Sequence, residues 1–250
     1  MKTEEKKVAV VTGGASGIGL ATAIGLEKDG YKVIVADINK VSWSFRSDVD
    51  ILSRRCDVSR YDQVVKLFQF CKDHLGRLDV LVNVAGVHYS SKFVHEENPE
   101  NFDKLTKVNV YGTYWCCHEA LKLMIEGTII NIGSSVGIAA DPAAAAYSAS
   151  KAWVIHFTKC LAQQYGKQGI RCNTLCPGAT DTPFLRNAFG NDPAKLKEIA
   201  EYNPRGMVAT PEDIANTILF LVSDKSRFVN GATWTVDGGE SIFYWEPPKG

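Results

Sequence analysis

Two side chains in the segment "AYSASK" could carry out proton transfer together. Tyr147 and Lys151 are four residues apart, with only small residues between them. On a helix this spacing places two side chains on one face, one turn apart. A neighbouring ammonium favours the phenolate form of a tyrosine and lowers its pKa, which suits a general acid or base. The alternative is a pair of solvent-facing residues on an ordinary helix.

A glycine-rich segment near the start of the chain could hold a pyrophosphate. The segment "TGGASGIG" covers residues 12–19 and directly follows the apolar run 7–12. At a turn from strand to helix, Gly13, Gly17 and Gly19 would let the backbone approach the ligand closely. The helix N-terminus would then offer free N–H groups and a partial positive charge. A tight turn formed only for packing is the alternative.

Asp37 favours the nucleotide interpretation. It ends the apolar run 32–37, where a carboxylate can accept hydrogen bonds from both ribose hydroxyls of adenosine. The same charge repels a 2′-phosphate. The glycine segment contains no Arg or Lys that could bind such a phosphate, and Ser16 stands directly before Gly17. Lys40 is the only nearby cation. We therefore predict NAD(H) in preference to NADP(H).

Composition excludes several classes of function. The 250 residues include 28 Lys plus Arg and 28 Asp plus Glu, so the formal net charge of zero offers no basic field for nucleic acid or a membrane surface. No apolar segment approaches the roughly 18 residues that span a bilayer, and no signal-peptide pattern is present. The seven cysteines are dispersed without a CxxC pair, and we expect no metal site and a cytoplasmic location.

Apolar runs alternate with segments of helix length along the whole chain. The expected strands are 7–12, 32–37, 53–58, 78–86, 128–134, 170–178 and 232–239, and the expected helices are 18–29, 60–75, 99–125, 147–166 and 211–223. This order predicts an α/β fold in one domain over residues 1–250, with a parallel sheet covered by helices. Residues 182–210 follow a strand and contain several Pro and Gly, so we expect a loop that forms a substrate lid.

Eight motifs occur in an order that is typical of one enzyme family. They are "TGGASGIG" (12–19), "DV" (57–58), "NVAG" (83–86), Asn109 in "KVNVYG", Ser134 in "GSSVG", "YSASK" (147–151), "PGATDT" (177–182) and "VDGG" (236–239). On these motifs the chain resembles the short-chain dehydrogenase/reductase family in its compact form. The resemblance implies a Rossmann-like, doubly wound fold with a seven-stranded, mainly parallel sheet.

The resemblance also implies a catalytic set of Asn109, Ser134, Tyr147 and Lys151. Tyr147 would exchange the proton of an alcohol or ketone substrate, and Ser134 would hydrogen-bond the substrate oxygen. The adjacent Ser135 is expected to be structural. Lys151 would bind the nicotinamide ribose, and Asn109 would shape a helix kink and hold a water that joins Lys151 to solvent.

The cofactor contacts that the resemblance implies come from several segments. They are Gly13, Ser16, Gly17, Ile18, Gly19, Asp37, Asp57, Val58, Asn83, Ala85, Gly86, Tyr147, Lys151, Pro177, Gly178, Thr180 and Thr182. Asp57 and Val58 would hold the adenine edge, and Asn83 would lie along the adenosine. Thr182 would bond the carboxamide or the phosphates. Thr180 stands where the family usually has Ile or Val.

The substrate is less well defined than the reaction. Ser134, His88, Tyr147, Trp153 and Phe184 are candidate pocket residues, although Trp153 could equally belong to the core and His88 to a solvated loop. We expect a secondary alcohol or ketone of the hydroxysteroid, sugar, polyol or hydroxy-acid class. The alternatives are 3-oxoacyl reductase activity, an epimerase or dehydratase, and a catalytically silent NAD-binding sensor or scaffold.

Assembly is expected from two features. The family usually forms tetramers through its long helices, here about 101–125 and 147–166, and a dimer is the alternative. The tail 241–250 contains Phe243, Tyr244 and Trp245, which would form an exposed apolar patch on a monomer. The tail therefore packs on its own domain or docks on a neighbouring subunit.

Overall fold

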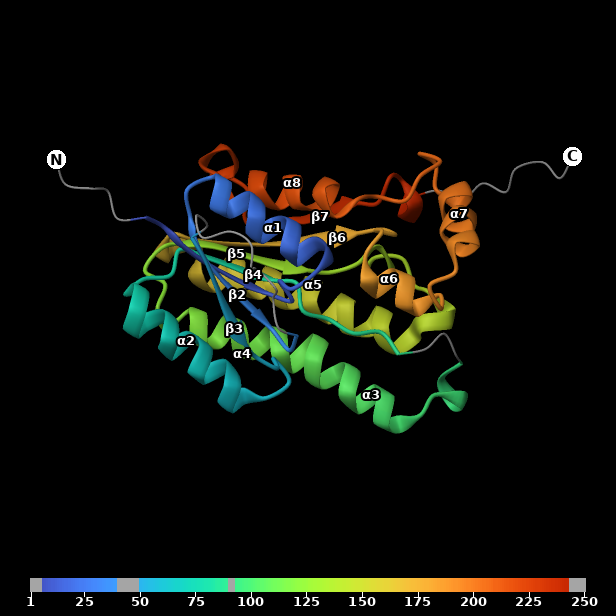
Figure 1. Cartoon of the computed structure of the whole chain (residues 1–250), viewed down its shortest axis with the longest axis horizontal. Coiled ribbons are helices and arrows are strands. Elements are labelled where there is room, and N and C mark those ends of the chain that lie inside the picture. The colour runs from blue at the N-terminus through green and yellow to red at the C-terminus, as the bar shows by residue number, and fades with distance from the viewer. Residues whose placement is uncertain (1–5, 40–49, 90–92, 243–250) are drawn as a thin grey trace, which may run out of the picture.

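Seven strands form one sheet in which every pairing is parallel, in the order β3-β2-β1-β4-β5-β6-β7 (Figure 1). The computed structural model describes residues 6–39, 50–89 and 93–242. The strands are β1 (Val8–Thr12), β2 (Lys32–Asp37), β3 (Ile51–Arg55), β4 (Val80–Asn83), β5 (Gly127–Ile132), β6 (Ile170–Pro177) and β7 (Thr233–Val236). The predicted doubly wound, Rossmann-like fold is confirmed.

Helices cover both faces of the sheet (Figure 1). They are α1 (Gly17–Lys28), α2 (Tyr61–Leu75), α3 (Pro99–Thr106), α4 (Thr113–Ala120), α5 (Ala145–Tyr165), α6 (Pro183–Ala188), α7 (Pro193–Tyr202) and α8 (Pro211–Val222). Val33 and Val35 pack in the core under α1 and α8, whereas Ile34 packs in the core under α2, α4 and α5. Burial on both faces explains why these strands are apolar without alternation. No helix in the described ranges is long and apolar enough to cross a membrane.

The predicted helix 99–125 is interrupted. Between α3 and α4 the residues Lys107–Gly112 form a π-helical segment, and α4 ends at Ala120. Gly112 lies against the end of the strand layer, since a Cβ added to it would be 2.7 Å from Cγ2 of Val58. A π-helical turn inside a helix frequently marks a functional position, and this one contains Asn109.

The predicted lid 182–210 is not a loop throughout, because it contains α6 and α7. Each helix begins with a proline, which is the favoured residue at the first helical position. The preceding residue caps each one: Oγ1 of Thr182 accepts a hydrogen bond from the Leu185 amide at 3.3 Å, and Oδ1 of Asp192 accepts one from the Ala194 amide at 2.9 Å. Of the three prolines in this segment, Pro183 and Pro193 therefore begin helices, and Pro204 lies in a turn after α7.

Candidate active site

The four residues predicted to be catalytic lie close together at the carboxyl edge of the sheet. Ser134 follows β5, Tyr147 and Lys151 come from one face of α5, and Asn109 comes from the π-helical segment. The Ser134 side chain lies beside the Tyr147 hydroxyl and lowers its pKa. The Nζ atom of Lys151 is 5.7 Å from the centre of the Tyr147 ring. This edge is where ligands bind in parallel α/β sheets.

The Lys151 side chain is buried, and its ammonium group is hydrogen-bonded to a backbone carbonyl. Its side chain is 4% exposed, and Nζ donates a hydrogen bond to the Ile132 carbonyl at 2.8 Å. Gly86 leaves the space beside it open, since a Cβ there would lie 3.4 Å from both Nζ of Lys151 and Oδ1 of Asn109. Burial disfavours the charged form and lowers the pKa of Lys151 to about 8.

The pKa of Tyr147 differs from the prediction. Burial raises it to about 12, and the neighbouring Ser134 side chain offsets only part of this rise. The expected lowering by Lys151 is therefore wrong for the ligand-free protein. The physical reason is that the Lys151 ammonium is bound to the Ile132 carbonyl, while the Tyr147 hydroxyl is surrounded by protein, so the loss of water around the phenolate dominates.

Asn109 connects the loop after β4 to α5. Its Oδ1 accepts a hydrogen bond from the Val87 amide at 2.8 Å, and its Nδ2 donates to the Val87 carbonyl at 3.0 Å and to Oγ of Ser150 at 3.2 Å. The side chain is 1% exposed. All three bonds are internal, so Asn109 is a positioning residue in this structure. Sequence reasoning did not identify Val87 or Ser150 as its partners.

The start of α1 has donors available for an anion. The Ser16 side chain makes no capping hydrogen bond, and no acidic residue occupies the first turn of the helix. Gly13 and Gly17 adopt positive φ values of 66° and 51°, which favour glycine. A Cβ on Gly13 would lie 2.7 Å from the Ala85 amide nitrogen, so the glycine loop is packed against the loop after β4. Ile18 and Gly19 follow in the first turn of α1. These features fit a bound pyrophosphate.

Asp37 is fixed beside this glycine loop. Its Oδ2 accepts a hydrogen bond from the Ala15 amide at 3.0 Å, and its Oδ1 accepts one from the Asn39 amide at 2.8 Å. Each carboxylate oxygen keeps a further lone pair, which is what a pair of ribose hydroxyls requires.

A second cation near Asp37 was missed by the sequence analysis. Strand β3 covers 51–55 rather than 53–58, and its pairing with β2 sets Arg55 opposite Asp37. The expectation that Lys40 is the only nearby cation is therefore wrong, and Lys40 itself lies outside the described residues. The sequence does not give the register of β2 with β3, because a long connection separates the two strands.

Two of the predicted cofactor contacts have side chains that serve the protein interior. Asn83 is 3% exposed, and its Nδ2 donates to Oδ1 of Asn131 on β5 at 2.8 Å. Val58 is 6% exposed and belongs to the core under α2. The Val58 side chain is committed to packing, and the Asn83 amide group donates inside the protein while its Oδ1 has no hydrogen-bond partner among the described residues. The Asp57 carboxylate accepts from the backbone amide and the hydroxyl of Ser59, at 2.9 and 2.7 Å.

The segment after β6 forms the other wall of the site. Pro177 ends the strand, and Gly178 must be glycine because a Cβ would lie 2.8 Å from Cα of Asp237. Oγ1 of Thr180 donates to the Gly178 carbonyl at 3.0 Å. Thr182 lies against the glycine loop, since a Cβ on Gly17 would be 2.9 Å from its Cγ2 atom. The base of the lid and the glycine loop therefore meet at Thr182.

The predicted substrate residues divide into two groups. His88 and Phe184 lie beside Tyr147, with ring centres 5.1 and 6.2 Å away. Trp153 does not, and its ring instead stacks on Phe157 at 4.7 Å. Trp153 comes six residues after Tyr147 on the same helix. At 3.6 residues per turn, its side chain lies about 240° around the helix axis from that of Tyr147. The pocket alternative for Trp153 is therefore wrong.

The lid carries a cation that is already paired. Arg186 makes two hydrogen bonds to the Asp181 carboxylate, at 2.6 and 2.8 Å. This bidentate pair spans the end of the segment after β6 and helix α6. In the described part of the chain, no cluster of His, Cys, Asp and Glu has an arrangement that could hold a metal ion.

Known proteins share both the sequence and the shape of this site. The family described as enoyl-(acyl carrier protein) reductase matches residues 13–241, which include the glycine loop, the catalytic set and the lid. The chain belongs to the short-chain dehydrogenase/reductase family. As a member it is an oxidoreductase that uses a nicotinamide cofactor.

Similar members of the family cover nearly the whole chain. A 3beta-hydroxysteroid dehydrogenase of Mediterraneibacter gnavus is 35% identical, over 96% of this chain and 96% of the relative. An uncharacterized oxidoreductase of Bacillus subtilis is 36% identical, over 96% and 93%. Ligand-free aldohexose dehydrogenase of Thermoplasma acidophilum has a TM-score of 0.90 at 32% identity, covering 98% of each chain.

Structures of this shape are known with either cofactor. ElxO has NADP bound, with a TM-score of 0.87 and 29% identity over 95% of this chain and all of the other. The 3-ketoacyl-(acyl-carrier-protein) reductase of Brucella melitensis is complexed with NADH, with a TM-score of 0.88 and 31% identity over 95% and 99%. Cofactor preference in this family member must therefore be argued from its own residues.

Proposed function

We propose that the protein transfers hydride between a secondary alcohol or ketone and the nicotinamide of NAD(H). One observation carries this proposal: Ser134 lies beside the Tyr147 hydroxyl and lowers its pKa, and the Lys151 Nζ atom is 5.7 Å from the centre of the Tyr147 ring, at the edge of the sheet where α1 also begins. When bound, the nicotinamide supplies the hydride acceptor or donor. The residues of the chain then bind, orient and exchange the proton.

In the direction of oxidation, Tyr147 takes the alcohol proton at its phenolate oxygen. Ser134 hydrogen-bonds the same substrate oxygen and holds it at the tyrosine. Lys151 would bind the nicotinamide ribose of a bound cofactor, and its positive charge would favour the phenolate. Asn109 keeps the loop after β4 and helix α5 in place through its bonds to Val87 and Ser150. Reduction uses the same groups in reverse.

Asp37 supports the preference for NAD(H). The carboxylate is held at the glycine loop by the Ala15 amide, where it would accept hydrogen bonds from the adenosine ribose. A 2′-phosphate would place like charges together. If the ratio kcat/KM with NADP(H) equals that with NAD(H), this assignment is wrong.

The substrate class is proposed from the groups beside Tyr147. Phe184 and His88 offer an aromatic face and a polar ring nitrogen, which fits a hydroxysteroid, sugar, polyol or hydroxy acid. The similar 3beta-hydroxysteroid dehydrogenase favours the steroid among these. An acyl carrier would need free cations near the lid, and Arg186 is instead paired with Asp181. All four residues of the catalytic set are present, which argues against a silent sensor or scaffold.

We also propose that the protein forms a homo-oligomer, a tetramer or a dimer, through α4 and α5. Tyr111 and Tyr114 are 48% and 46% exposed on this side, where the rings of Tyr114 and Phe157 are 5.6 Å apart. A cytoplasmic location is proposed from the seven free cysteines, six of which are buried. The tail beyond Ile242 lies outside the described residues, so its docking remains a prediction.

A screen of alcohols tests the proposed activity. Purified protein is mixed with NAD⁺ and steroid, sugar, polyol or hydroxy-acid alcohols, and NADH is followed at its absorbance band. We expect turnover with at least one class and a larger kcat/KM with NAD⁺ than with NADP⁺. Binding of NADH without turnover of any alcohol or ketone would instead support the sensor alternative.

A further inference from the structure

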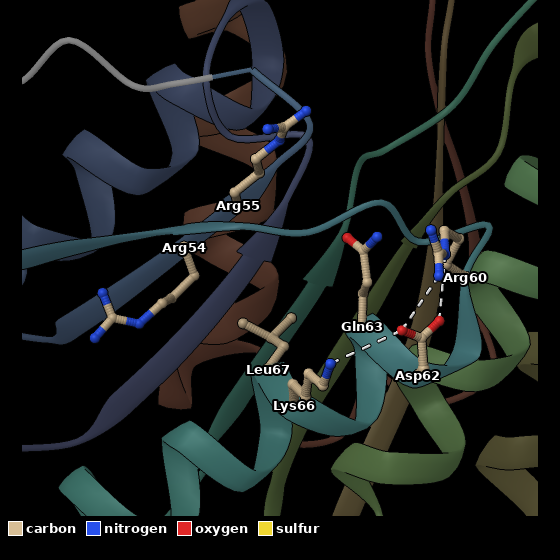
Figure 2. A pocket seen from close by; sticks show the side chains of 7 residues that line it. All are labelled: Arg54, Arg55, Arg60, Asp62, Gln63, Lys66 and Leu67. Carbon is tan, nitrogen blue, oxygen red and sulfur yellow. Dashed lines mark hydrogen bonds and ion pairs between the residues drawn. The ribbon is translucent and has the colours of Figure 1, made fainter.

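Basic side chains gather at the edge strand β3, around a pocket of about 390 Å³ (Figure 2). The pocket is lined by Arg54, Arg55, Arg60, Asp62, Gln63, Lys66 and Leu67. Four of these residues are cations and only one is a carboxylate, so this edge of the sheet carries an excess of positive charge. An anion that approaches β3 is therefore attracted.

Three of the four cations are already engaged by neighbouring side chains. Arg60 and Lys66 approach the Asp62 carboxylate at 3.3 and 4.0 Å. The guanidinium of Arg54 lies 3.5 Å from the centre of the Phe70 ring and also donates to a backbone carbonyl. Arg55 is exposed and makes no ion pair or ring contact with another residue of the described ranges. It is the cation that a ligand could use without breaking an existing contact.

The sheet register places Arg55 beside the cofactor residue Asp37. The two residues are direct partners in the parallel pairing of β2 with β3, where strands are about 4.8 Å apart. Partners in a parallel sheet present their side chains on the same face. Ile51 belongs to the core under α1, so the alternate residues of β3, Arg55 included, face the α1 side. Asp37 faces the same side, because its carboxylate accepts from the glycine loop.

Arg54 is the natural comparison, because it is one residue earlier on the same strand and leaves it on the opposite side. Figure 2 shows the side chains of Arg54 and Arg55 diverging from β3, with Arg54 directed away from Arg55. Arg54 covers Phe70 of α2. The two arginines have the same charge and are neighbours on one strand, but they lie on different faces of the sheet.

We infer that Arg55 is a specificity-determining residue for the cofactor, as the positive partner of Asp37 at the adenosine 2′-position. This inference rests on the proposed nicotinamide function. With Asp37 present, the carboxylate occupies the ribose hydroxyls and repels a 2′-phosphate. Arg55 offsets part of that repulsion, and it becomes a phosphate ligand once the carboxylate is removed. The balance of these two side chains sets the ratio of NAD(H) to NADP(H) binding.

A structural role gives a different expectation. Charged residues on an edge strand prevent pairing with another sheet, and Arg55 could serve only that purpose. In that case its replacement would leave nucleotide binding unchanged. The two roles are therefore separated by measuring the affinity for a 2′-phosphate directly.

The experiment compares the binding of 2′,5′-ADP and 5′-ADP by calorimetry in four proteins: wild type, Asp37→Ser, Asp37→Ser with Arg55→Met, and Asp37→Ser with Arg54→Met. Asp37→Ser should bind 2′,5′-ADP at least about tenfold more tightly than wild type, since a hydrogen bond from a charged donor replaces a repulsion. Adding Arg55→Met should cancel most of this gain, while adding Arg54→Met should preserve it. Affinity for 5′-ADP should change little between the three variants.

The inference is overturned if the Asp37→Ser protein with Arg55→Met binds 2′,5′-ADP as tightly as Asp37→Ser alone. It is also overturned if Arg54→Met has the same effect as Arg55→Met, because the effect would then be general surface charge. Failure of wild type to bind either NADH or 5′-ADP would instead contradict the proposed function itself. Thermal unfolding of each variant shows whether it is folded before binding is measured.

Discussion

At the scale of single residues, burial dominates the electrostatics of the site. Burial moves the pKa of Lys151 down to about 8 and that of Tyr147 up to about 12, so both shifts favour the neutral forms, although Lys151 still carries its proton below pH 8. A proton acceptor in alcohol oxidation must be the phenolate. The pKa of Tyr147 therefore has to fall when the site is occupied, and the positive charge of an oxidised nicotinamide beside it acts in that direction.

Replacing Lys151 tests the cost of its burial. The pKa of Lys151 is about 8 in the folded protein and 10.5 as its ordinary value. Between these values the unfolded chain holds a proton that the folded protein lacks, so this residue makes stability rise with pH across that window. Below pH 8 the burial of the charged Lys151 lowers the free energy of unfolding by its full amount. That amount is at most about 3 kcal/mol, since one pKa unit corresponds to about 1.36 kcal/mol.

We therefore expect Lys151→Met to gain stability relative to wild type near pH 7.5, and this advantage to shrink as the pH approaches 10. Urea unfolding at several pH values measures the difference. Lys159→Met is the matched control, because Lys159 is an exposed lysine on the same helix. A difference between Lys151→Met and wild type that stays constant over this range would contradict the assigned burial cost.

At the scale of elements, the sequence predicted the alternation of strands and helices and a parallel sheet, but not how segments meet. Apolar runs located the strands of the sheet, because parallel strands are buried on both faces. The resemblance implied a kink at Asn109, and the structure has a π-helical segment there, Lys107–Gly112, whose length and bounds the sequence pattern did not predict. The neighbour of Asp37 depended on the register of β3, and the two alternatives for Trp153 were left open because its position around α5 was not considered.

Asn109→Ala tests whether the π-helical segment positions the site. The substitution leaves the amide and carbonyl of Val87 without their partners, which we expect to cost about 1–3 kcal/mol of stability. We expect kcat to fall by more than tenfold while KM for the cofactor changes little. Ser150→Ala is the control, since it removes one Asn109 bond and keeps both bonds to Val87. Equal effects of the two variants on kcat would contradict this role.

At the scale of the whole molecule, the aromatic surface of α4 and α5 is the proposed site of assembly. Trp153, Phe157 and Tyr114 form a row of ring contacts there. We expect Tyr114→Glu to lower the mass measured by analytical ultracentrifugation, because a desolvated charge in an apolar interface is costly. Tyr202→Glu is the control, being 75% exposed on α7. An unchanged mass for Tyr114→Glu would place the interface elsewhere.

We propose that Tyr147 exchanges the substrate proton at the nicotinamide site. The most direct measurement is NADH formation by Tyr147→Phe with the best alcohol from the screen, together with the affinity for NADH by fluorescence titration. We expect a loss of turnover of about 10²–10⁴-fold with NADH affinity within a few-fold of wild type. Turnover close to wild type in this variant would contradict it.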